Sequence, residues 1–193
     1  MGDDANEEDL ALMALVARGD EKAFARLVEK HQHAVLGTVA KMTNRSADTE
    51  DIAQQVFIRL WKSAKRYEPS AKFTTFLFTI TRNLVFNVTR KKSRRKEHSF
   101  DEQEDEWHQS IEDTNPQSRP DHSLANAELK KVVDLAIASL PEKQRLAVIL
   151  RRYEQMPYEE IADVLELSVS AVKSQLFRAR TALREALEPY LKD

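Results

Sequence analysis

The sequence predicts an all-α protein made of two small helical domains joined by a flexible acidic linker. Apolar residues recur at helical spacing over most of the 193 residues, and no segment alternates as a strand would. Between the two helical regions, six of the ten residues from Glu97 to Glu106 are acidic, and "DTNPQSRPDHS" follows with two prolines and no apolar period. We therefore place an acidic N-terminal tail at residues 1–18, the first domain at 19–96, the linker at 97–122 and the second domain at 123–193.

Three helices are predicted in the first domain. The first begins after Asp20, a suitable N-cap residue, and its apolar residues from Phe24 to Val35 share one face. The second contains "DIAQQVFIRLWK", and the third begins near Phe73, after a break at Pro69. The apolar faces of these helices can form one small bundle.

Composition excludes several classes of function. Cys is absent, which removes thiolate metal sites and cysteine nucleophiles and fits a cytoplasmic location. The three Gly residues are far apart, so a glycine-rich phosphate-binding loop is excluded, and no apolar run is long enough for membrane insertion. No nucleophile, base or metal-ligand set converges in the sequence. We therefore expect no enzyme, no catalytic residues, no metal and no cofactor.

The third predicted helix combines aromatic residues with a basic end. Seven Lys or Arg residues and no acid occur from Arg82 to Lys96, in a chain whose net charge is −2. With Phe73 at the centre of the buried face, an exposed face is expected to carry Thr75, Phe78, Thr79, Arg82 and Phe86. Aromatic rings can stack on unpaired bases while basic side chains bind phosphates. Alternatively, another helix covers the two phenylalanines and the basic run is a solubilising tail.

The second predicted domain ends in a helix-turn-helix. The short amphipathic stretch "PYEEIADVL" is followed, after a tight turn, by "SVSAVKSQLFRARTALREAL". Ser168 is a suitable N-cap, and no acid occurs from Ser168 to Arg184. A helix that enters the DNA major groove requires such an acid-free face. A solvated helix in an ordinary bundle is the alternative.

Four segments together resemble the extracytoplasmic-function group of bacterial RNA polymerase sigma factors. They are "GDEKAFARLVEKH", "DIAQQVFIRLWK", "FTTFLFTITRN" and "LPEKQRLAVILR…PYEEIADVLELSVSAVKSQLFRARTALRE". The resemblance implies two domains, called sigma-two and sigma-four, that bind core RNA polymerase, direct it to specific promoters and promote DNA melting. The partners it implies are core polymerase, through its largest-subunit clamp helices and its flap region, promoter DNA and an anti-sigma factor.

The resemblance also implies a set of binding residues. Residues expected to bind the melted minus-ten element are Tyr67, Lys72, Thr75, Thr79, Arg82, Asn83, Phe86, Arg90 and Lys91. Residues expected to bind the minus-thirty-five element are Ser168, Ser170, Ala171, Lys173, Ser174, Arg178 and Arg180. Residues expected to dock on polymerase are Asp51, Gln54, Gln55, Arg59 and Trp61.

Some features depart from that family's pattern, and two of them bear on the structure. Glu166 stands in the turn between the last two helices, where the family commonly has Gly. If its φ is positive, Glu at this position costs about 1 kcal/mol. The acids from Asp101 to Glu106 also lie next to a strongly basic run, and we hypothesise that they shield the basic ends or mimic nucleic acid.

Two other functions compete with this reading. A free-standing transcriptional regulator would bind an operator through the same helix-turn-helix, but it would leave "DIAQQVFIRLW" and "FTITRN" without a purpose. A helical adaptor would use the DNA-like surfaces to bind an acidic protein.

Overall fold

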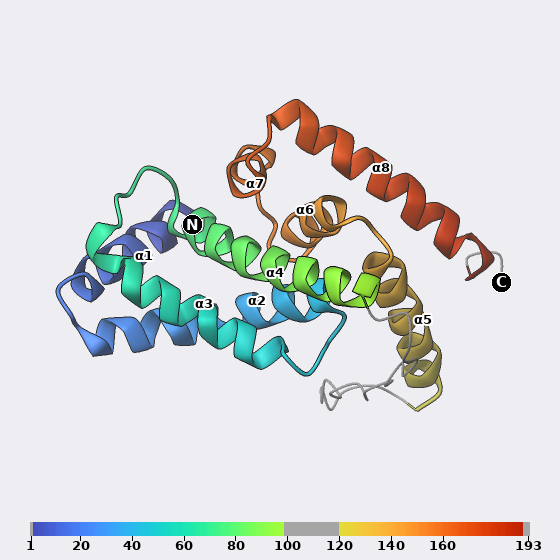
Figure 1. Ribbon diagram of the computed structural model, residues 1–193, viewed down its shortest axis with the longest axis horizontal. Coiled ribbons are helices and arrows are strands. Elements are labelled where there is room, and N and C mark those ends of the chain that lie inside the picture. Colours follow the sequence, from blue (N-terminus) through green and yellow to red (C-terminus); the bar gives the residue numbers. More distant parts are fainter. Residues whose placement is uncertain (1, 99–119, 191–193) are drawn as a thin grey trace.

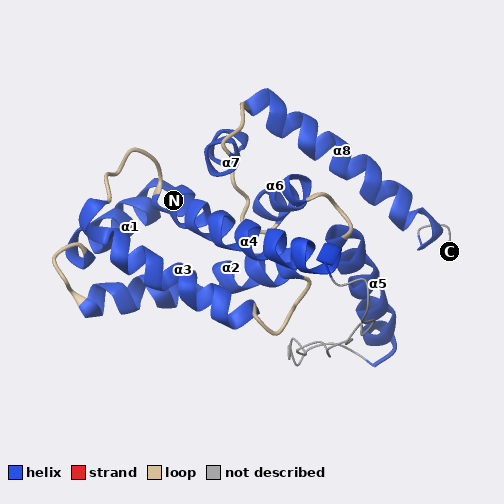
Figure 2. Cartoon of the chain, viewed as in Figure 1, coloured by secondary structure: helices blue, strands red, loops and turns tan. Residues whose placement is uncertain are grey.

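The computed structural model describes residues 2–98 and 120–190, and within these residues every regular element is helical (Figure 2). The prediction of an all-α fold is confirmed. The α-helices are α1 (Gly2–Val16), α2 (Glu21–Thr43), α3 (Thr49–Ser63), α4 (Phe73–His98), α5 (Pro120–Ala138), α6 (Glu142–Arg152), α7 (Tyr158–Leu165) and α8 (Val169–Leu187). Short 3-10 helices follow α3 and α8, at Ala64–Arg66 and Glu188–Tyr190.

Helices α1 to α4 form the N-terminal bundle (Figure 1). Helix α2 begins as predicted, because the Asp20 carboxylate accepts hydrogen bonds from the backbone N–H groups of Lys22 at 2.9 Å and Ala23 at 3.0 Å. Leu60 of α3 and Phe73 of α4 are fully buried between the helices. The predicted apolar faces therefore do meet in one core.

The prediction of an N-terminal tail is wrong, because α1 is a packed helix of this bundle. Asp9, Leu12, Met13 and Val16 are buried, and their spacing is that of one helix face. The many acids at this end of the chain concealed that short apolar stripe. Asp9 is buried because Lys30 and His31 of α2 bind its carboxylate, at 2.7 and 3.0 Å.

Helices α5, α6 and α7 pack against the N-terminal bundle, and α8 packs on these three helices (Figure 1). One continuous apolar cluster runs from Leu12 in α1 to Leu176 in α8, so the two predicted domains share a core. At the end of α2, the Arg145 guanidinium of α6 donates to the Met42 carbonyl at 2.9 Å, and Lys41 lies 4.3 Å from the Tyr153 ring centroid. Helix α7 packs against α4 (Figure 1).

The predicted linker falls mainly outside the described residues. Helix α4 continues to His98 and α5 begins at Pro120, so both helices extend into the range 97–122. The acids from Asp101 to Glu106, and the shielding hypothesis built on them, lie outside the described residues.

Candidate nucleic-acid interface

The α4 face, defined as Thr75, Phe78, Thr79, Arg82 and Phe86, is not exposed as predicted. The exposed fractions of Thr75, Phe78, Arg82 and Phe86 are 4%, 3%, 7% and 8%, and Thr79 is half-buried. Helix α7 and the segment before it cover this face. The expectation of an exposed surface is therefore wrong, because α4 has apolar residues on two sides and each side packs against its own neighbour.

Arg82 lies at the centre of the contact between α4 and α7. Its guanidinium donates to the Val164 backbone carbonyl at 2.7 Å and to a Glu166 carboxylate oxygen at 2.7 Å. It also donates twice to the Asn83 side-chain carbonyl, at 3.1 and 2.6 Å. These bonds satisfy the planar guanidinium, which explains how a charged side chain can be buried there.

Two further polar contacts join α4, or the residue before it, to helices of the C-terminal region. Lys72, one residue before α4, forms a 2.8 Å ion pair with Glu160 of α7. Nearer the other end of α4, the Thr89 hydroxyl donates to the Glu142 carboxylate of α6. Arg90 and Lys91 are exposed beyond this contact.

Glu166 adopts the left-handed backbone conformation that was considered above for the turn between α7 and α8. Its φ is 54° at the C-terminal cap of α7. The conditional prediction is thus met, and the residue carries the strain of a non-glycine side chain in this region. The hydrogen bond and positive charge of Arg82 lower the pKa of Glu166 below its usual value. The strained residue therefore supplies a carboxylate that stays ionised at neutral pH.

The Tyr67 loop, residues 67–72, connects the 3-10 helix after α3 to α4. The Tyr67 ring packs on Phe76, with ring centroids 4.7 Å apart, and burial together with the charge of Asp9 raises the pKa of Tyr67. Its hydroxyl is buried and has no hydrogen-bond partner among the described residues. A hollow of about 340 Å³ opens beside it, lined in part by Thr75, Thr79 and Asp163 of α7.

Asn6 was not predicted, although it holds the start of α4. Its side-chain carbonyl accepts a hydrogen bond from the Phe73 backbone N–H at 2.9 Å. The side chain of Lys72, which precedes Phe73, has no hydrogen-bond acceptor and cannot cap the helix. Asn6 of α1, 67 positions earlier, supplies the acceptor instead. The sequence has no N-cap residue next to Phe73, which indicates that a distant residue caps α4. The sequence does not indicate which residue that is.

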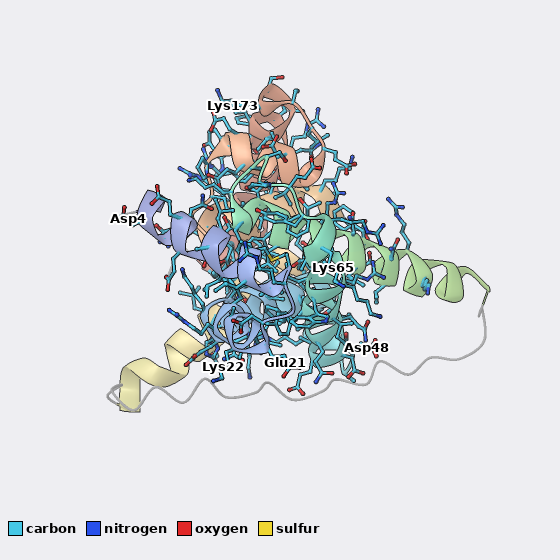
Figure 3. All side chains as sticks on the ribbon, turned by 90° about the vertical axis from the view of Figure 1, so that its left-hand side faces the viewer. Asp4, Glu21, Lys22, Asp48, Lys65 and Lys173 are labelled. Atoms are coloured by element: carbon cyan, nitrogen blue, oxygen red, sulfur yellow. The ribbon has the colours of Figure 1, made fainter. Side chains whose placement is uncertain are left out.

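Helix α8 presents the predicted recognition surface. Ser168 caps the helix by accepting from the Ala171 N–H at 3.2 Å, and Val172, Leu176 and Ala179 are buried. The exposed members of the predicted set are Ser168, Ser170, Lys173, Ser174, Arg178 and Arg180, while Ala171 is half-buried. Figure 3 shows Lys173 at the outer end of the molecule. Sequence reasoning missed Phe177 on this surface, whose exposed fraction of 69% is unusual for so large an apolar side chain.

Helices α2 and α3 enclose an apolar groove at the predicted docking surface. Its volume is about 680 Å³, and it is lined by Glu21, Phe24, Val28, Gln54, Phe57, Ile58 and Trp61. Trp61 packs edge-on against Phe24, with ring centroids 5.0 Å apart. Asp51, Gln55 and Arg59 are exposed on α3. The sequence indicated the polar residues, whereas Phe24 and the exposed Ile58 emerge only from the packing of the two helices.

Neither a metal cluster nor a bilayer-spanning helix is found where the structure is described. Within residues 2–98 and 120–190, no group of three or more His, Cys, Asp or Glu side chains is placed to hold a metal ion. None of the helices over the same ranges is both long and apolar enough to cross a membrane.

Comparisons with known proteins identify the family. The family model for sigma-70 region 2 matches residues 27–95, and the model for sigma-70 region 4 matches residues 130–183. The RNA polymerase sigma-H factor of Pseudomonas aeruginosa is 33% identical over 188 residues, which is 97% of each chain. The ECF RNA polymerase sigma-E factor of Escherichia coli is 33% identical over 185 residues, 95% of this chain and 96% of that one.

Solved structures agree with these relatives. CnrH, solved in complex with the cytosolic domain of CnrY, is 25% identical, with a TM-score of 0.70 over 94% of this chain and 98% of its own. The sigma factor RpoE of Bartonella quintana, solved with the anti-sigma factor NepR, shares the fold, with a TM-score of 0.69 at 24% identity over 86% of this chain and 98% of its own. The chain thus belongs to the ECF group of the sigma-70 family, and it is a sigma factor that directs RNA polymerase to promoters.

Proposed function

We propose that this sigma factor divides promoter recognition between its two ends. The C-terminal end, through α8, binds the minus-thirty-five element as intact duplex, and the N-terminal end, through the Tyr67 loop and α4, holds the unpaired strand of the minus-ten element. The observation that carries the proposal is the outer surface of α8, where Lys173, Arg178 and Arg180 are exposed and acids are absent from Ser168 to Arg184. Such a helix can place its first turns at base edges and its basic flanks at phosphates.

The Tyr67 loop supports the role in strand capture. The buried Tyr67 hydroxyl has no partner among the described residues, so its release to solvent offsets part of the packing lost when the ring leaves Phe76 to meet a base. A base stacked on an aromatic ring gains roughly 1–3 kcal/mol, which partly offsets the lost base pairing in melted DNA. Asn83 is exposed next to Arg82, which supports a contact with the same strand.

Two grooves support docking on core polymerase. The groove between α2 and α3 has an apolar floor and a polar rim with Gln54, which suits a helix of the largest-subunit clamp. A second groove of about 660 Å³ lies between α5, α6 and α8. Its apolar residues include Ile137, Leu176 and Leu183, and Arg151 and Arg152 flank them. We assign this groove to the flap region of polymerase.

The proposed action is not catalysis, and we place it in the cytoplasm, where polymerase acts. An anti-sigma factor is the proposed regulatory partner. The solved complex of the relative CnrH with the cytosolic domain of CnrY supports it, because that structure shows a related chain bound by a second protein.

The test is binding to core polymerase followed by run-off transcription from a promoter library. The full chain should bind core polymerase and produce specific transcripts, while the isolated protein should bind promoter duplex weakly, since polymerase fixes both DNA contacts at one spacing. Ile58→Asp, which places a charge in the apolar groove, should abolish binding to core. Lys65→Asp, a charge change at an exposed position outside the groove, is the matched control.

The same experiment separates the alternatives. Nanomolar, sequence-specific duplex binding without polymerase would favour an operator-binding regulator. Failure to associate with core would overturn the proposed function.

A further inference from the structure

Two acids of the C-terminal region contact residues predicted to bind the unpaired strand, and a third contacts Thr89 further along α4. Glu160 pairs with Lys72, Glu166 pairs with Arg82, and Glu142 accepts from Thr89. Lys72 and Arg82 belong to the set expected to bind the minus-ten strand. A carboxylate that accepts from a guanidinium or an ammonium group occupies the donors that a phosphate would otherwise use.

The apolar part of the same surface is also occupied. Phe78 and Phe86 are buried, and Phe78 lies beside Met156 and Pro157 of the segment before α7. Aromatic rings can stack on bases only if their faces are accessible. The α4 face cannot therefore meet a nucleotide while α7 lies on it.

We infer that α7 is an intramolecular inhibitor of strand binding, held on the α4 face by its acidic residues. In the free chain this closed arrangement prevents the α4 face from binding unpaired DNA, and α7 must leave before the minus-ten strand can be captured. This inference rests on the proposed function, since it concerns regulation of the same site.

The docking surfaces remain accessible in the closed arrangement. Gln54 and Gln55 are exposed on α3, and Lys173 is exposed on α8 at the outer end of the molecule (Figure 3). Core polymerase can consequently bind the closed chain through these surfaces. Opening then follows when polymerase and duplex DNA hold the C-terminal helices at a new position, because they bind the open form better.

The contact between α4 and α7 is built to be reversible. The Glu166 side chain is 74% exposed, so water competes for its ion pair with Arg82. The left-handed backbone of Glu166 also stores strain, at φ 54°. Glycine would adopt this backbone conformation with less strain than Glu166. Glycine has no carboxylate, however, and could not pair with Arg82.

The test uses a double substitution that weakens the contact without harming the fold. Glu160→Gln removes one charge conservatively, and Glu166→Gly removes the other while relieving the positive φ. Glu159→Gln is the matched control, since Glu159 is an exposed acid on the same helix. The probe is a fluorescent single-stranded DNA of random sequence, about 12 nucleotides long, which spans a typical binding site.

We expect the double variant to bind this probe with an apparent Kd about four- to twenty-five-fold lower than the wild type. Each ion pair has one exposed partner and one that is largely buried, and we expect its loss to shift the closed-to-open ratio about two- to fivefold. The apparent Kd follows the open fraction. Glu159→Gln should bind like the wild type. Equal binding by the double variant and this control would overturn the inference.

A distance measurement checks the mechanism independently of DNA. The chain has no native Cys, so Lys65→Cys and Glu185→Cys provide two exposed labelling sites, one on each side of the contact. The closed arrangement predicts one narrow distance distribution in the wild type and a second, broader population in the double variant. A broad distribution in the wild type that the double substitution leaves unchanged would contradict it.

The two proposals fail differently. If the wild type directs transcription with core polymerase but the double variant gains no affinity for the probe, the inhibitory role of α7 is wrong and the proposed function stands. If the wild type neither binds core nor directs transcription, the proposed function itself is wrong.

Discussion

Helices α4 and α8 both carry residues expected to meet promoter DNA, and the fold leaves their surfaces in opposite states. On α8, one side is buried through Val172, Leu176 and Ala179, and the other side is open to solvent. On α4, Phe73 and Leu77 are buried on one side and Phe78 and Phe86 on another.

The difference follows from the number of apolar sides. A helix with one apolar stripe needs one partner, so its polar face stays free. A helix with two apolar sides leaves a large apolar surface exposed until a second partner covers it. In this chain α7 is that second partner, so a face that we expect to bind DNA is also a packing face of α4.

The largest expected effect compares phenylalanines on the two helices. Phe78→Ala should lower the free energy of unfolding by about 3–5 kcal/mol, because it opens a cavity under α7. Phe177→Ala should change it by less than about 0.5 kcal/mol, since that side chain is 69% exposed. Urea unfolding of both variants measures the difference. Similar losses would mean that the two faces are not in opposite states.

The next effect concerns the open face alone. Arg178→Ala should weaken binding of polymerase holoenzyme to a promoter identified by run-off transcription by roughly 1–3 kcal/mol, as expected for one lost base contact. Arg184→Ala, an exposed change further along α8, should have a smaller effect that is the same for all sequences. Equal and sequence-independent losses would show that Arg178 contacts only phosphate.

A third prediction concerns the support beneath the α4 face, where α1 packs. Burial alone would raise the pKa of Asp9, but hydrogen bonds from His31 and Lys30 and their charges lower it below 3.8. The ionised Asp9 therefore adds stability above this pH, and that stability is lost as the pH falls through the folded-state pKa.

Asp9→Asn should consequently lower the free energy of unfolding by about 1.5–3 kcal/mol at pH 7, the range for hydrogen bonds to charged groups. The difference from the wild type should shrink near pH 3. Urea unfolding at the two pH values measures it. A difference that grew in acid would contradict the assignment.

The smallest effect concerns the start of α4. Asn6→Ala should cost about 1 kcal/mol, because the Phe73 N–H loses its acceptor. Asn6→Asp keeps an acceptor and should restore most of the stability. Urea unfolding again measures both, and equal losses in the two variants would show that the cap contributes nothing.

Local features of the fold could be predicted from the sequence because they depend on neighbouring residues. The Asp20 and Ser168 caps, the buried stripe of α8 and the strained turn at Glu166 each involve residues within a few positions of one another. These features depend on hydrogen bonds within a helix turn and on side chains at helical spacing, so the nearby sequence is enough to predict them.

The candidate site was predictable only in part. The exposed residues of α8 follow from one helix, whereas the groove of α2 and α3 needs Phe24 and Ile58 from two. Helix α1 was missed because its stripe is short and lies among acids, and an isolated stripe of that kind does not show that a partner exists.

By itself, the sequence determined the helices, their apolar stripes and the family to which the chain belongs. Tertiary structure decided that both apolar sides of α4 are covered, and it joined Arg82 to Glu166, 84 positions apart. Periodicity shows which side of a helix is apolar and must be buried. Which other helix buries it depends on long-range packing, because charge pairing and shape complementarity involve residues from the whole folded chain.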